Sequence, residues 1–148
     1  MNLRGQLEPV QRTEEYKEGL KSKIEEIERL LETNQAADEA IDAFNNLTGR
    51  SYDDDYFRHY WRSISIQEFV DEACNPYPVK VSDIQTNELI ELVRRIQDVD
   101  TYGSDTRFYL EVLMANTNMP GVSDLIFYED LTPAEIVEEI LRYKPIVL

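Results

Sequence analysis

Apolar residues recur along most of the chain at the three- and four-residue steps of a helix that buries one face. In the first predicted helix, which begins near Glu14, these residues are Leu20, Ile24, Ile27 and Leu31. A second helix is predicted to end near Gly49. A further helix should begin at Ser65, which has Glu68 three residues later in the pattern of a capping box. No segment shows the alternation expected of a strand, so the pattern predicts an all-α fold.

The same order of predicted helices recurs in the second half of the chain. Helices are expected over 89–96, over 104–116 and from Thr132, which forms a second capping-box pattern with Glu135, to Pro145. The closing helices align without a gap over eleven residues, EFVDEACNPYP (68–78) against EIVEEILRYKP (135–145). An aromatic pair precedes each of them, Tyr56–Phe57 and Phe127–Tyr128. Two capped amphipathic helices can also look alike by chance, but we favour an internal repeat.

The repeat predicts two similar, distorted four-helix modules, each with a very short aromatic third helix. Residues 1–12 show no periodicity and are expected to form a loose lead-in. A degenerate first module should span residues 13–78, and a second module residues 79–148. The two prolines of NPYPVK (75–80) separate them, because proline ends the preceding helix.

The stretch GVSDLIFYED (121–130) holds more apolar surface than a short segment needs. A four-helix core can absorb Leu125 and Ile126, which leaves Phe127 and Tyr128 among acidic neighbours. Exposed aromatic residues with a polar rim are typical of a protein-binding patch. Composition alone favours equally the packing of this pair between the two modules.

The formal net charge of -15 is spread over the whole chain. Residues 1–78 carry 17 acids and 9 bases, and residues 79–148 carry 13 acids and 6 bases. Such a charge argues against direct binding of nucleic acids or anionic membranes, because both would be repelled. It favours a basic partner, although solubility alone explains it as well.

Catalytic and metal-binding motifs are absent from the sequence, so we expect a protein that is not an enzyme and takes no cofactor. His59 is the only histidine and is expected to be a packing or surface residue. Asp53–Asp55 could bind a divalent cation, but a solvated acidic turn is favoured because the ligand spacing of a calcium loop is lacking. The lone Cys74, the absence of a long apolar run and the lack of a signal-peptide pattern at MNLRGQLEPV lead us to expect a cytoplasmic protein.

Three segments carry a resemblance to a known family: VSDIQTNELIELV (81–93), PGVSDLIFYED (120–130) and TPAEIVEEI (132–140). Over about residues 81–144 the chain resembles the immunity proteins that protect bacteria from colicin-type and pyocin-type DNases. The hallmark of this family is a Ser-Asp-x-x-Tyr-Tyr third helix, which stands here as SDLIFY (123–128). This sequence departs from the pattern in having Phe127 in place of the first tyrosine and Glu129 in place of a following proline.

The resemblance implies a distorted four-helix bundle that binds a basic HNH-type nuclease domain one-to-one and blocks its access to nucleic acid. It also implies which residues make the contacts. The shared contacts fall on the third helix, at Ser123, Asp124, Phe127 and Tyr128. The contacts that select the partner fall on the second helix, at Thr106, Arg107, Leu110, Glu111 and Met114.

Single-domain members of the family leave residues 1–78 unexplained. We interpret this region as a supporting or specificity-extending module rather than a second nuclease-binding site. Two other functions stay open at this point. The first is an acidic helical adaptor or oligomerisation protein, in which the aromatic segments would be covered within the chain. The second is a small enzyme or metal-binding protein centred on Asp53–Asp55.

Overall fold

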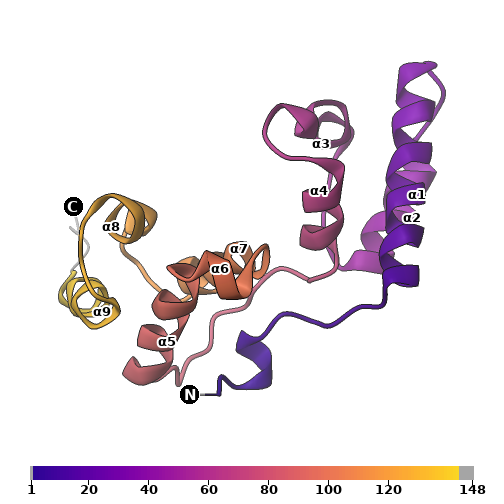
Figure 1. Cartoon of the computed structure of the whole chain (residues 1–148). Coiled ribbons are helices and arrows are strands. Elements are labelled where there is room, and N and C mark those ends of the chain that lie inside the picture. The colour runs from indigo at the N-terminus through magenta and orange to yellow at the C-terminus, as the bar shows by residue number, and fades with distance from the viewer. Residues whose placement is uncertain (1, 144–148) are drawn as a thin grey trace. The chain divides into compact units, whose positions relative to one another are not determined.

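The computed structural model describes residues 2–143. Over these residues the secondary structure is helical, with no strand, and the predicted all-α fold is confirmed (Figure 1). The chain divides into two compact units. Val10–Tyr77 form one, which we call the N-terminal unit. The described residues up to Pro9 join those from Pro78 onward in the other, which we call the C-terminal unit.

The N-terminal unit consists of α1 (Glu14–Glu32), α2 (Asp38–Thr48), α3 (Asp54–His59), the 3-10 turn η2 (Tyr60–Arg62) and α4 (Ile66–Ala73). The four residues predicted for the inner face of α1 are all buried. Gly49 ends α2 in a left-handed conformation, with φ of 75°, which glycine adopts without strain. Ser65 and Glu68 form the predicted capping box. The sequence therefore places these helices correctly.

Aromatic side chains fill the core of the N-terminal unit. Phe57 of α3 meets Phe44 of α2 in a T-shaped arrangement, with ring centroids 5.5 Å apart, and lies 5.4 Å from the ring of Phe69 of α4. Its neighbour Tyr56 is partly buried, and its hydroxyl group donates to the carboxylate of Glu72 at 3.1 Å. The aromatic pair of this unit is thus part of its core.

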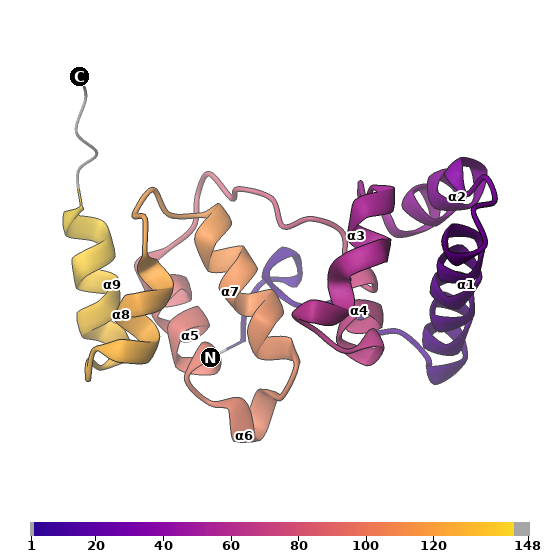
Figure 2. The same ribbon diagram turned by 90° about the horizontal axis from the view of Figure 1, so that it is seen from above.

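The C-terminal unit consists of the 3-10 turn η1 (Gly5–Leu7), α5 (Thr86–Ile96), α6 (Val99–Tyr102), α7 (Asp105–Ala115), α8 (Val122–Tyr128) and α9 (Pro133–Arg142). Figure 2 shows the short α8 beside α9. The predicted capping box of Thr132 and Glu135 is present. The predicted end of this helix at Pro145 lies outside the described residues. The short α6 was not predicted; Asp98 caps it by accepting from the backbone N–H of Thr101 at 3.3 Å.

The segment from Asn2 to Pro9, which we call the N-terminal strap, differs from the loose lead-in that the sequence predicted. Leu7 is completely buried and Leu3 nearly so, in the core that α5, α7, α8 and α9 share. The Arg4 guanidinium group donates to the carboxylates of Glu88 at 2.7 Å and Asp83 at 3.1 Å. These contacts hold the strap against the C-terminal unit.

Candidate protein-binding surface

Helix α8 presents an aromatic pair to solvent. Gly121 begins the helix in a left-handed conformation, with φ of 72°. Val122 and Ile126, four residues apart, face the core and are buried, as i and i+4 positions of one helix face require. The next two side chains point away from the core, so Phe127 is 55% exposed and Tyr128 is 83% exposed. The pair therefore lies outside the hydrophobic core of the C-terminal unit.

Carboxylates border this pair. Asp124 is exposed in the first turn of α8, where the positive end of the helix dipole stabilises a negative charge. Glu129 and Asp130 follow the pair and are also exposed. Ser123 is half-buried. An exposed aromatic surface with an acidic edge suits a partner that brings basic side chains.

A shallow pocket of about 480 Å³ lies beside the pair. It is lined by Ile96, Gln97, Val99, Ile126, Phe127, Tyr128, Glu129, Asp130 and Leu131. The Gln97 side-chain amide donates to the Leu131 carbonyl at 3.3 Å, which joins the end of α5 to the loop after α8. Val99 is 61% exposed, and the sequence analysis missed it because α6 was not predicted. The signal that could have found α6 is Asp98, an N-cap residue three positions before Thr101.

The residues expected on α7 have unequal exposure. Met114 is 54% exposed and Arg107 is exposed, while Thr106 and Glu111 are half-buried. The Thr106 hydroxyl donates to the Gly103 carbonyl at 2.9 Å. Leu110 is half-buried and packs against the core, so part of this side chain stabilises the fold. The opposite face of α7 is buried through Tyr109, Val112 and Leu113.

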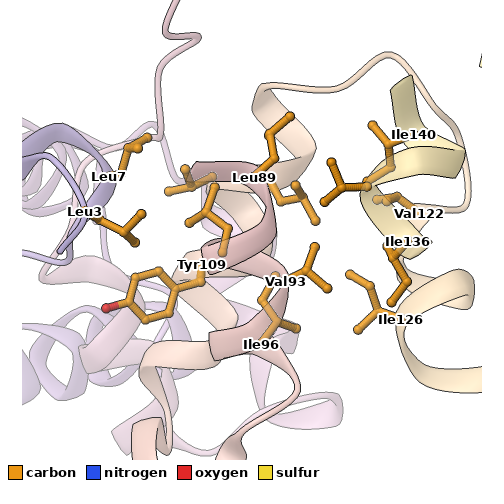
Figure 3. Close-up of a cluster of buried hydrophobic side chains, with 14 of the residues drawn as sticks. Leu3, Leu7, Leu89, Val93, Ile96, Tyr109, Val122, Ile126, Ile136 and Ile140 are labelled. Carbon is orange, nitrogen blue, oxygen red and sulfur yellow. The ribbon is translucent and has the colours of Figure 1, made fainter. Parts of the chain in front are cut away.

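One hydrophobic core positions both helices. In Figure 3, Val93 and Ile96 of α5 lie between Tyr109 of α7 on one side and Val122 and Ile126 of α8 on the other. The nine expected residues therefore fall on two helices of the same unit. The pocket beside Tyr128 includes the aromatic pair and none of the residues expected on α7.

The acidic run of the N-terminal unit has local structural roles. Asp53 caps α3 by accepting from the backbone N–H of Tyr56 at 2.8 Å. Asp54 lies 3.8 Å from the Arg58 guanidinium group. The Asp55 carboxylate lies 3.0 Å from His59 Nδ1. Within residues 2–143, no group of three or more acidic, histidine or cysteine side chains is placed to hold a metal ion.

Comparison with known protein families gives a match over the C-terminal unit. Residues 81–145 match the family described as colicin immunity protein / pyocin immunity protein. The resemblance predicted from the sequence is confirmed over this region, which we call the immunity region. The match includes all nine expected residues and begins after the N-terminal unit.

The family match over the immunity region suggests a bacteriocin immunity protein. Proteins of this class are typically non-enzymatic inhibitors that bind a toxin. No curated protein and no solved structure matches the chain. Over the residues that the structure describes, no helix is both long and apolar enough to cross a membrane.

Proposed function

We propose that this protein binds the basic nuclease domain of an HNH-type bacteriocin one-to-one and blocks its access to nucleic acid. The observation that carries the proposal is the exposed pair Phe127–Tyr128 on the Ser-Asp helix of the immunity region. Large aromatic side chains that become buried on association supply much of the binding energy of protein interfaces. An exposed pair on this helix is available for that purpose.

Charge supports the same partner. The net charge of -15 attracts a basic domain and accelerates encounter by electrostatic steering. A DNA-cutting domain needs a positive surface to bind phosphates. An acidic protein that covers this surface competes with DNA through both charge and bulk. Inhibition of this kind requires no catalytic residue on the immunity protein.

The N-terminal unit is proposed to support or extend this surface rather than repeat it. Its aromatic pair is the predicted counterpart of Phe127–Tyr128, but Phe57 is only 1% exposed. A side chain buried in the core cannot become newly buried against a partner. The duplication itself stays a prediction from the sequence.

The adaptor alternative requires Phe127 and Tyr128 to be covered within the chain. Both are exposed on the C-terminal unit, and no observation on this pair favours that function. The toxin-binding proposal gives these two exposed side chains a role, because a partner can cover them.

Plasmid cleavage tests the proposal. A panel of purified colicin-type and pyocin-type DNase domains, including any encoded beside this gene, would be titrated with the protein. We expect one domain to lose activity with an end point at one equivalent. Failure of the protein to bind or inhibit any domain of the panel would contradict the proposal.

A charge reversal locates the surface. Asp124→Lys should weaken inhibition by about 3 kcal/mol in binding free energy, because it opposes a basic partner inside the contact. Asp42→Lys is the matched control, since Asp42 is an exposed aspartate of α2 and the net charge changes equally. Equal effects of the two variants would mean that only long-range charge matters and that α8 is not the contact.

A further inference from the structure

One carboxylate of the N-terminal strap connects two helices of the immunity region. Glu8 Oε1 accepts from Arg95 Nη1 of α5 at 2.7 Å. Glu8 Oε2 accepts from the Tyr109 hydroxyl of α7 at 3.1 Å. Arg95 Nη1 also donates to the Tyr109 hydroxyl oxygen at 2.9 Å, which closes the triangle. Glu8 is separated from Tyr109 by 101 residues of sequence and lies outside the family match.

The burial of Tyr109 and Arg95 makes their hydrogen bonds to Glu8 important for the stability of this cluster. Tyr109 and Arg95 are both buried, so the loss of a hydrogen-bond partner is costly for each, while the Glu8 side chain is 35% exposed at the edge of the cluster. Arg95 Nε donates to Glu91 at 2.8 Å, and this second bond fixes the guanidinium plane. Burial raises the pKa of Tyr109 to about 12, and its protonated hydroxyl group donates to Glu8.

Tyr109 lies on the same helix as the residues expected to select the partner. Leu110 is its neighbour, and Met114 follows five residues later. The other end of α7 is held by Asn116, whose side-chain oxygen accepts from the backbone N–H of Val81 at 2.6 Å. Loss of the Glu8 contact would leave the Tyr109 hydroxyl group with its bond to Arg95, so the first half of α7 would be held less firmly while Asn116 still holds its end.

We propose that Glu8 is a positioning residue for α7, and that the N-terminal strap thereby sets how tightly the partner-selecting face holds its toxin. This inference rests on the proposed function for its binding consequence. It assigns to a segment outside the family match a role in that binding. The positioning itself can be measured on the free protein.

Amide hydrogen exchange on the full chain is the first test. Glu8→Ala should raise exchange in α7 and leave α9 unchanged. Glu8→Gln should have a smaller effect, because its side-chain oxygen can still accept one of the two bonds. Glu138→Ala is the matched control, since it removes an equal charge from the exposed face of α9, where Glu138 pairs with Arg142 at 2.7 Å. Unchanged exchange in α7, or an equal rise in α7 and α9, would overturn the proposal.

Dissociation of a bound DNase domain is the second test. Glu8→Ala should raise the dissociation rate by roughly tenfold, the effect expected when hydrogen bonds to a charged group are lost. In double-mutant cycles, Glu8→Ala should couple with Met114→Ala on α7 and be additive with Tyr128→Ala on α8. Equal coupling to both would indicate general loosening and overturn the positioning role. If the wild type binds no DNase domain, the proposed function fails, and the exchange in α7 still decides the role of Glu8.

Discussion

The two units contain the same aromatic pair and use it in opposite ways. In the N-terminal unit, Phe57 is buried among the rings of α2 and α4. In the C-terminal unit, Tyr128 is 83% exposed at the end of α8. Both pairs lie on a short helix that precedes the closing helix of the unit. The position of a motif in the chain thus does not decide whether its side chains are core or surface.

The neighbours of each pair explain the difference. The N-terminal unit places Phe44 and Phe69 where Phe57 can meet both rings. In the C-terminal unit the closing helix brings the aliphatic Ile136 to the core, and Val122 and Ile126 pack in the same cluster. Val122 and Ile126 are the residues of α8 that are buried. The aromatic pair of α8 is left to face solvent.

The largest expected difference between the two aromatic pairs is in their contribution to stability. Phe57→Ala should lower the free energy of unfolding by about 3–5 kcal/mol, because it opens a cavity in the core. Phe127→Ala is the matched control and should change it by about 0.5 kcal/mol or less, as is usual at exposed positions. Urea unfolding of both variants measures the difference. Similar losses of stability would show that Phe127 is packed.

The next largest expected difference between the two aromatic pairs is in their contribution to toxin affinity. Tyr128→Ala should weaken toxin binding by about 2 kcal/mol or more, as expected for an aromatic residue at the centre of an interface. Tyr56→Ala, which removes the tyrosine of the N-terminal pair, should leave affinity unchanged while lowering stability through the loss of the bond to Glu72. Isothermal titration with the inhibited DNase domain measures both variants. A larger loss of affinity from Tyr56→Ala would move the binding surface to the other unit.

A pH titration tests the contribution of one buried carboxylate, Glu91, to the stability of the C-terminal unit. Hydrogen bonds from Arg94 and Arg95 outweigh burial and lower the pKa of Glu91 to about 2, below its ordinary value of 4.5. Because the folded-state pKa is depressed, this stabilisation is complete above pH 4.5 and is lost as the pH falls toward 2. We expect a loss of up to about 2 kcal/mol in the C-terminal unit, after allowance for solvent screening at the half-exposed Arg94.

Amide exchange in each unit measures this loss as a function of pH. In the Glu91→Gln variant, the C-terminal unit should be less stable at neutral pH and less sensitive to acid. An unchanged acid dependence in this variant would mean that other carboxylates control it.

The smallest expected effect on binding comes from one exposed side chain of α7, and α2 supplies the comparison. Met114→Ala should weaken binding by about 1 kcal/mol, and the loss should differ between toxins if α7 selects the partner. Leu47→Ala on α2 removes an exposed side chain of similar size and should have no effect. Inhibition constants against two DNase domains measure both. Equal losses against the two domains would assign Met114 to shared binding.

The sequence predicted the parts of the fold that depend on local patterns. The inner face of α1 and the capping boxes of α4 and α9 follow from spacing over a few residues, and the structure confirms them. The strap could not be predicted in this way. It offers only Leu3 and Leu7 as apolar side chains, and their burial depends on residues about 80 or more positions away.

The candidate site shows the same limit. The surplus of apolar residues in SDLIFY does not say which side chains face the core, and only the packing of Val122 and Ile126 shows that Phe127 and Tyr128 lie outside it. The pocket beside the pair needs Val99, which lies on a helix of four residues. So short a helix has too few apolar positions to show periodicity. The contact roles of the nine residues stay predictions.

The ion pair between the strap and α5 also bears on the order of folding during synthesis. Arg4 leaves the ribosome 84 residues before its partner Glu88. The N-terminal unit is complete within that interval and can fold while the strap still lacks the helices that bury it. The immunity region would then close only after α7 has followed, when Glu8 meets Arg95 and Tyr109. A nascent chain would therefore hold one folded unit and one unpaired N-terminal segment, and the surface formed by α7 and α8 would form last.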